Sequence, residues 1–205
     1  MLARTAAASR RPVTRLARAG VLLLLALLAA TTSMTFAQDL VPVLTSTPTF
    51  AGVPWNAKPD AAKQQLVAKG YAFDHIDDRH DLWFRGRIGS QPVQIVEAFG
   101  PSGLFRTLVA FLTRDKDCRP TYDALLKELT TTYGAPSERN ANWNGANFES
   151  AVKAGNAQFN AVWSSRGKNG GGILIEIEKN LTVSIYYDSA SAHDALAARA
   201  KAAGR

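Results

Sequence analysis

The densest group of side chains that could perform chemistry lies between Asp74 and Asp81. Four carboxylates and two imidazoles occur within these eight residues, and such groups hold divalent metal ions or transfer protons. If a metal ion binds, we predict His75, Asp77 and His80 as its ligands. The spacing matches neither a zinc-protease helix nor a calcium-binding loop. Because Asp-rich turns are common between strands, we interpret the segment as a self-paired, solvated turn and expect no cofactor.

Aromatic and arginine side chains gather on the strand that is predicted after this turn. Trp83, Arg85 and Arg87 alternate with apolar residues, so they share one face of an extended segment. Aromatic residues and arginine are enriched in protein interfaces. Together with Trp143, which lies in an asparagine-rich stretch, these are the residues that we predict to contact a ligand or partner. The alternative is that helices cover this face.

The other reactive residue types give weaker signals. Cys118 is the single cysteine of the chain. A thiol near a helix start can be activated, and an odd cysteine can pair between two chains. We interpret Cys118 as structural and keep an intermolecular disulfide as the alternative. The chain has no Gly-x-Ser-x-Gly motif. Glu176 and Glu178 share one predicted strand face, which is typical of a solvated sheet surface.

The first 37 residues have the pattern of a secretory signal peptide. Five arginines precede Gly20, no acidic residue occurs before Asp39, and residues 21–30 are all apolar. A basic region, a short apolar region and a small-residue site, here ending at Ala37, are typical of such signals. The apolar run is shorter than the roughly 20 residues of a membrane-spanning helix. We therefore expect no membrane span after cleavage, with an uncleaved anchor as the alternative.

Export would place the protein in the periplasm or outside the cell. Ser9-Arg10-Arg11 begins like a twin-arginine signal, so the general secretory and twin-arginine routes both stay open. The chain has a formal net charge of +7, which falls to +2 without residues 1–37. Nucleic-acid binding needs a clustered basic surface, so nucleic acid is not the partner that we expect. We expect an envelope or secreted protein, or a small ligand.

The rest of the chain divides into an extended leader at 38–51, one domain at 52–188 and an alanine-rich tail at 189–205. The tail is expected to form a marginal, frayed helix with a capping box at Ser191, because alanine favours helix but buries little surface. Apolar periodicity predicts two main helices and seven strands. The helices are at 59–69 and 120–133, and the strands at 71–76, 82–88, 92–98, 104–112, 159–163, 173–177 and 181–187.

The order of these elements is typical of an α+β fold. We expect two layers, an antiparallel sheet of about six to seven strands packed by two main helices. A duplicated helix-plus-meander unit is one interpretation of this order. In the last hairpin, inward-facing residues must stand opposite one another. This predicts Ile177 opposite Leu181, and a three-residue loop with Asn180 in the left-handed conformation.

Several turn and core segments resemble those of small exported bacterial domains of uncharacterised function. They are Gly52-Val53-Pro54-Trp55, Tyr133-Gly134-Ala135-Pro136, the isolated Trp163, Ile173-Leu174-Ile175-Glu176 and the closing strand from Val183 to Asp188. The expected architecture is similar to that of β-lactamase-inhibitor-protein-like and outer-membrane-assembly lipoprotein domains. The resemblance implies a binding or envelope role and supplies no catalytic residues. The anchoring cysteine of the lipoproteins is missing after the apolar run.

From these observations we expect an exported, non-catalytic binding or interaction domain of the bacterial envelope. One alternative is a metal-dependent hydrolase that uses the cluster from His75 to Asp81. Another alternative, by analogy of architecture alone, is an inhibitor of a secreted enzyme.

Overall fold

The structure is a computed structural model, and it describes residues 44–143, 145–165 and 170–204. The predicted signal peptide and the first part of the predicted leader lie outside the described residues. The strands are β1 (Ala72–Ile76), β2 (Leu82–Ile88), β3 (Gln91–Gly100), β4 (Gly103–Phe111), β5 (Glu138–Ala141), β6 (Phe159–Ser164), β7 (Gly172–Ile177) and β8 (Val183–Asp188). The α-helices are α2 (Pro59–Ala68), α3 (Cys118–Tyr133), α4 (Phe148–Ala154) and α5 (Ala192–Ala202).

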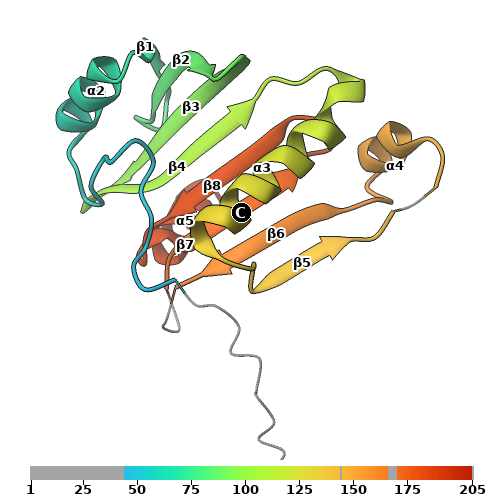
Figure 1. Cartoon of the computed structure of the whole chain (residues 1–205). Coiled ribbons are helices and arrows are strands. Elements are labelled where there is room, and N and C mark those ends of the chain that lie inside the picture. The colour runs from blue at the N-terminus through green and yellow to red at the C-terminus, as the bar shows by residue number, and fades with distance from the viewer. Residues whose placement is uncertain (1–43, 144, 166–169, 205) are drawn as a thin grey trace, which may run out of the picture. The chain divides into compact units, whose positions relative to one another are not determined.

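The eight strands form one antiparallel sheet in the order β1-β2-β3-β4-β8-β7-β6-β5 (Figure 1). α2 precedes β1–β4, and α3 precedes β5–β8, so a helix followed by four strands occurs twice. The two units meet where β4 pairs with β8. The prediction of an α+β fold built on an antiparallel sheet is confirmed. The sheet has eight strands, slightly more than the six to seven predicted.

The additional strand is β5, in the polar stretch that follows α3. All four of its residues are exposed, and it forms an edge of the sheet by pairing with β6. A strand that faces solvent on both sides has no apolar alternation, so hydrophobic periodicity does not detect it. The same polar stretch contains the seven-residue helix α4.

The face of the sheet that α3 crosses, here called the covered face, carries the main core (Figure 1). Leu66 of α2 and Tyr122 of α3 are fully buried in this core. Trp163 of β6 is also 0% exposed, and its indole N–H donates to the carbonyl oxygen of Gly134 at 2.8 Å. A buried indole needs such a partner. One register row of this face shows its composition: Phe84, Ile95, Val109, Ile185, Ile175 and Ala161.

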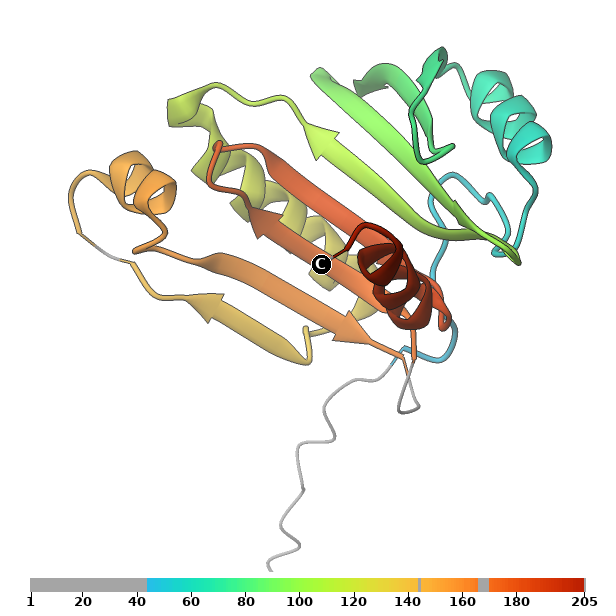
Figure 2. The same ribbon diagram turned by 180° about the vertical axis from the view of Figure 1, so that it is seen from behind.

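The opposite side of the sheet, here called the open face, carries α5 as its single helix among the described residues (Figure 2). The predicted alanine-rich tail thus forms a helix that lies against the sheet. Its predicted capping box is wrong, because Ser191 makes no side-chain hydrogen bond to the start of α5. A small second cluster of buried apolar residues, centred on Ala98, Phe105 and Ala192, lies beneath this helix.

The register of the β7–β8 hairpin differs by two residues from the prediction. Ile177 pairs with Val183 and not with Leu181. The turn is closed by the N–H of Leu181, which donates to the carbonyl oxygen of Glu178 at 2.8 Å. Leu181, and not Asn180, adopts a positive φ of 68° and is buried. The turn therefore places an apolar side chain in the core, and a shift of two residues keeps every strand residue on its predicted face.

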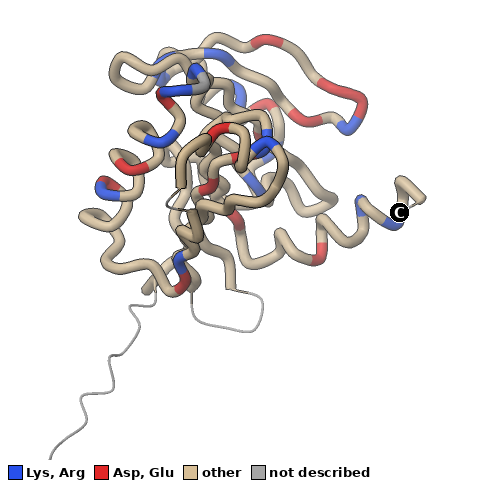
Figure 3. Tube along the Cα trace, turned by 90° about the vertical axis from the view of Figure 1, so that its right-hand side faces the viewer, with Lys and Arg blue, Asp and Glu red and all other residues tan. Residues whose placement is uncertain are grey.

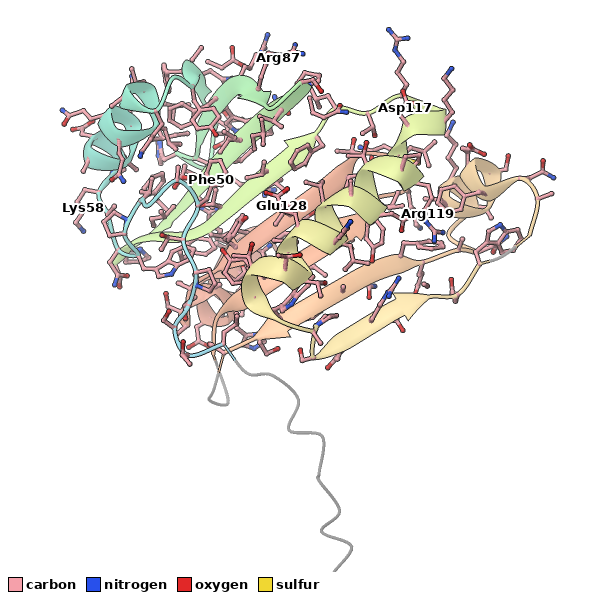
Figure 4. All side chains as sticks on the ribbon, viewed as in Figure 1. Phe50, Lys58, Arg87, Asp117, Arg119 and Glu128 are labelled. Atoms are coloured by element: carbon pink, nitrogen blue, oxygen red, sulfur yellow. The ribbon has the colours of Figure 1, made fainter. Side chains whose placement is uncertain are left out.

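Residues before α2 pack on the core of the domain. The N–H of Leu44 donates to the carbonyl oxygen of Ser164 at 3.1 Å. The ring of Phe50 lies 5.6 Å from that of Tyr71 and 5.9 Å from that of Tyr187. Figure 4 labels Phe50 in this segment. Val53 is fully buried. This segment therefore contributes to the covered face.

Lysine and arginine are interspersed with aspartate and glutamate along the described trace (Figure 3). None of the described helices combines the length and the apolar character that crossing a membrane requires.

Candidate functional site

The segment from Asp74 to Asp81 contains the end of β1 and the turn to β2, and its own hydrogen bonds hold the turn together. Asp77 Oδ1 accepts the N–H groups of Arg79 and Asp81, both at 2.9 Å, and Asp77 Oδ2 accepts the indole N–H of Trp83 at 3.2 Å. Burial alone would raise the pKa of Asp77, but these hydrogen bonds outweigh it and hold the pKa below its usual value. Both oxygens of this predicted metal ligand are therefore already engaged.

The two histidines of this segment do not form a cluster that could bind a metal ion. The imidazole of His75 stacks on the indole of Trp83, with centroids 5.3 Å apart, and its Nδ1 lies 3.1 Å from Asp74 Oδ2. Within the described ranges, no three His, Cys, Asp or Glu side chains are gathered so that they could hold one metal ion. A metal site at His75, Asp77 and His80 stays a prediction that this geometry does not support.

Three of the four predicted contact residues lie together on the open face of β2. Trp83, Arg85 and Arg87 alternate along the strand with residues of the covered face. The guanidinium of Arg85 donates to Asp74 Oδ2 at 2.8 Å, and its side chain is 69% exposed. Arg87 donates to the carbonyl oxygen of Ser90.

The fourth predicted contact residue, Trp143, lies elsewhere. It follows β5 at the opposite edge of the sheet from β1 and β2. Its indole N–H donates to the carbonyl oxygen of Gly145 at 3.0 Å. The structure therefore does not bring Trp143 to the other three residues.

A row of apolar side chains crosses the open face, and we call it the apolar row. Six neighbouring strands contribute one residue each, and the register places these residues opposite one another: Trp83, Val96, Leu108, Tyr186, Leu174 and Val162. Val96 is buried and the other five are half-buried. The stacked ring of His75 continues the row on β1, where it pairs with Trp83. α5 lies over residues two positions further along the strands, such as Ala98.

A polar pocket lies beside the apolar row, near the β7–β8 turn. Its volume is about 460 Å³, and its lining includes Glu176, Glu178, Asn160 and Tyr186. Glu178 Oε1 accepts the hydroxyl of Tyr186 at 3.0 Å and also that of Ser184. Burial, and then the neighbouring charge of Glu178, raises the pKa of Glu176. Such a pocket suits a group that donates hydrogen bonds to carboxylates, such as a hydroxyl, an amide or an ammonium.

Tyr186 belongs both to the apolar row and to the polar pocket. Burial, followed by the charges of Glu178 and Glu176, raises the pKa of its hydroxyl well above the usual range. The guanidinium carbon of Arg106 lies 5.0 Å from the centre of its ring. Tyr186 therefore stays protonated near neutral pH and acts here as a hydrogen-bond donor, which suits recognition better than proton transfer.

A smaller, mostly apolar cavity of about 260 Å³ lies on the covered face, between α3 and the sheet. Tyr187 of the sheet and Phe50 of the segment before α2 line it on one side, and Leu125, Glu128 and Tyr133 line it on α3. Figure 4 labels Phe50 and Glu128 on this side of the molecule. The cavity is narrower than most small-molecule sites, and several of its lining residues belong to the core.

Two features of the open face are beyond the reach of sequence patterns. Leu108 and Tyr186 come together through the pairing of β4 with β8, which joins distant parts of the chain. Arg199 of α5 forms a bidentate pair with Asp81, at 2.7 and 2.6 Å, across 118 residues. Alternation does indicate that Leu108 and Leu174 face away from the main core. This is the one feature of the sequence that points to apolar residues on the open face.

Cys118 lies at the start of α3 and is fully buried. As the single cysteine of the chain, it excludes an intramolecular disulfide. A disulfide with a second chain, which stays a prediction, would require this end of α3 to open.

Comparisons with known proteins give no relative for the chain. A scan against protein-family models, a search of curated proteins and a search of solved structures found no match. The resemblance to small exported bacterial domains therefore stays a prediction, and the functional argument depends on the geometry of the chain itself.

Proposed function

We propose that the chain is an exported, non-catalytic binding domain that recognises another protein through the apolar row. The observation that carries this proposal is the row itself, in which six adjacent strands each present one apolar side chain and five of these are half-buried. Contiguous apolar surface on a folded domain marks interaction sites. Trp83 and Tyr186 belong to residue types that are enriched at the centres of interfaces.

The residues beside the apolar row would orient the partner. The next register row carries a basic end on β2, small residues in the middle and polar or acidic residues on β7 and β6: Arg85, Gln94, Ala110, Ser184, Glu176 and Asn160. Opposite charges at the two ends of a surface favour one orientation of a partner with the complementary arrangement. We therefore expect a partner with an acidic group near Arg85 and a basic or donor group near Glu176.

The dimensions of the surface favour a protein over a small ligand. Six strands at a spacing of about 4.8 Å span roughly 24 Å, which is the scale of a protein interface. A small ligand fits the polar pocket better than it fits the row. Several groups that could serve catalysis are engaged in structural contacts, including Asp77 with the turn and Glu178 with Tyr186.

Cross-linking tests the apolar row as the contact surface. We would place a photoreactive residue at Leu174 and expose the full-length protein to the exported fraction of its source cells. We expect one stoichiometric cross-linked protein. Leu108→Asp, in the middle of the row, should reduce the yield at least tenfold while the far-ultraviolet spectrum stays unchanged. Val67→Asp is the matched control, because Val67 lies on α2 and is 49% exposed.

Two results would contradict the proposal. Equal losses of cross-linked protein with Leu108→Asp and Val67→Asp would show that the apolar row is not part of the interface. Absence of any cross-linked protein would argue against a protein partner and in favour of a small ligand in the polar pocket.

Export, as part of this proposal, is supported by the pattern of the first 37 residues. The measurement is the intact mass of the native protein. We expect a chain that begins at Gln38 in the periplasm or medium. An intact chain from Met1 in the cytosol would contradict export and would leave the argument for the apolar row unchanged.

A further inference from the structure

α5 is attached to the open face by few apolar contacts. Ala192, Ala195 and Leu196 are the apolar residues of α5 that join the small cluster above Ala98 and Phe105. Only one of these three has a large side chain. Apolar burial therefore contributes much less to holding α5 on the sheet than to holding α3, which buries Tyr122, Leu126 and Leu129.

One guanidinium makes most of the polar contacts of α5. Arg199 Nη1 and Nη2 donate to Asp81 Oδ2 and Oδ1 at 2.7 and 2.6 Å, and Nη2 also donates to the carbonyl oxygen of Phe99 at 2.7 Å. Its guanidinium carbon lies 4.9 Å from the centre of the Phe105 ring. The hydrogen bonds to Asp81 raise the pKa of the Arg199 guanidinium above its usual value. The Asp81 side chain is only 7% exposed while α5 is in place.

A cavity lies beside each half of α5. One of about 560 Å³ lies between the C-terminal half of α5 and the turn that contains His80. Another of about 340 Å³ lies beside His193 and the Arg106–Asp188 pair. Leu196 lines both cavities. Both halves of α5 thus border unfilled space, unlike a helix packed at interior density.

The connection to β8 defines where movement would begin. Ser189 is buried, and its N–H donates to the carbonyl oxygen of Phe105 at 2.9 Å. Ala190 and Ser191, which follow it, are exposed. A change of backbone angles at these two residues would move α5 without disturbing the pairing of β8 with β4.

We propose that α5 is a detachable cover of the open face. It leaves its seat as a unit around Ala190 and Ser191, and its release adds Ala98 and Phe105 to the surface beside the apolar row. The regulatory consequence rests on the proposed function, because a partner that contacts both rows must displace α5. The kind of partner that fits is a protein segment that covers the apolar row and reaches across the seat of α5.

The Asp81–Arg199 pair is compatible with reversible release. The carboxylate still accepts the N–H of Phe99 when Arg199 leaves, and both charges return to water once α5 is lifted. A buried ion pair gives little net stability, since the loss of hydration offsets much of the attraction. An isolated eleven-residue helix is marginal in water. After α5 has left the sheet as a unit, it therefore unfolds and competes less with a partner for the open face.

Hydrogen exchange of the full-length protein tests release without any partner. We expect the amides of α5 to exchange at least tenfold faster than those of β7 and β8. Arg199→Gln should accelerate amide exchange in α5 by a further tenfold or more and leave the exchange rates of β7 and β8 unchanged. Equal exchange rates in α5 and the sheet, or equal acceleration of both by Arg199→Gln, would overturn the proposal.

A disulfide lock provides the opposite perturbation. A β-carbon built on Gly100 lies 3.8 Å from that of Ala195, which is within the range of disulfides. In the oxidised Gly100→Cys/Ala195→Cys variant, α5 should exchange as slowly as β8, and reduction should restore the fast exchange. The reduced form is the matched control for both substitutions. Fast exchange in the oxidised form would overturn the assignment of the motion to α5 as a unit.

Binding separates this proposal from the proposed function. With the cross-linked partner in hand, the oxidised lock should bind at least tenfold more weakly than the reduced form. Equal affinity of the two forms would overturn the role of α5 as a cover, even if Leu108→Asp abolishes binding and so supports the apolar row. The exchange measurement needs no partner, so its outcome does not depend on the proposed function.

Discussion

The two faces of the sheet are built from the same strands but have different composition. On β7, Ile175 is fully buried on the covered face, whereas its neighbour Leu174 is half-buried on the open face. On β8, Ile185 and Tyr186 show the same contrast. The covered face carries the packing that stabilises the fold, and the open face keeps apolar surface that the fold does not bury. We infer that substitutions on the covered face mainly lower stability, whereas substitutions on the open face mainly lower binding.

The covered face also contains a buried carboxyl, that of Glu97. Its Oε1 accepts the hydroxyl of Thr107 at 3.1 Å, whereas Oε2 has no partner among the described residues. Burial raises the pKa of Glu97 to about 8, against the smaller opposing effect of the Thr107 hydrogen bond. Glu97 is therefore mostly protonated near neutral pH, which removes the cost of a buried charge.

The largest effect that we predict comes from Glu97 as the pH rises. The folded chain keeps the proton up to about pH 8, whereas the unfolded chain loses it near its ordinary pKa of 4.5. The folded state therefore binds more protons between these values, and Glu97 makes stability fall by about 1.4 kcal/mol per pH unit across this window. Glu97→Gln should remove this slope and be more stable than the unsubstituted protein at pH 8, by a few kcal/mol.

Urea denaturation at pH 4.5, 6 and 8 would measure this difference. Comparing the two proteins cancels the titration of the other carboxylates, which both share. Parallel pH profiles would mean that the Glu97 carboxyl is hydrated or paired in solution.

A pair of alanine substitutions on β7 gives the next largest effect and measures the contrast between the faces directly. Ile175→Ala should destabilise the protein by about 2–5 kcal/mol, because it leaves a cavity in the core. Leu174→Ala should destabilise it by about 1–2 kcal/mol, since part of that half-buried side chain is already in contact with water. Equal shifts of the urea midpoint would show that the open face is packed as tightly as the covered one.

Local patterns predict much of the covered face. Tyr122, Leu126 and Leu129 follow the 3.6-residue period, and all three are buried in α3. The predicted helix at 120–133 corresponds to Cys118–Tyr133 in the structure. Continuous apolar character places Leu104–Leu112 centrally, and β4 is indeed an inner strand of the sheet. These predictions succeed because periodicity records burial, which is a property of each segment on its own.

The parts that sequence analysis missed depend on contacts between distant segments or on surfaces without periodicity. The apolar row exists because β4 pairs with β8, and no local rule determines that pairing. The seat of α5 depends on Asp81 and Arg199, which are far apart in the chain. Alternation correctly assigns Trp83 and Arg85 to one face, yet it does not determine whether a helix covers that face.

The next prediction separates the structural role of Trp83 from its proposed role in binding. Trp83→Phe keeps an aromatic ring in the apolar row but removes the indole N–H that donates to Asp77. The loss of one partly exposed hydrogen bond should cost about 0.5–1.5 kcal/mol, which thermal denaturation can measure. Capture of the partner should fall less than threefold. A loss of binding as large as that of Leu108→Asp would mean that the turn at Asp77, and not the ring, forms the contact.

The smallest perturbation probes the two faces without destabilising either, through thiol labelling. Cys118 belongs to the core of the covered face and is 0% exposed, so it should react with a maleimide only when the chain unfolds. A cysteine introduced by Leu174→Cys should react in the native protein at least a hundredfold faster. Mass spectrometry of the labelled chain reports both sites in one sample, and urea should abolish the difference. Rapid native labelling of Cys118 would show that the start of α3 opens, and it would then make an intermolecular disulfide sterically feasible.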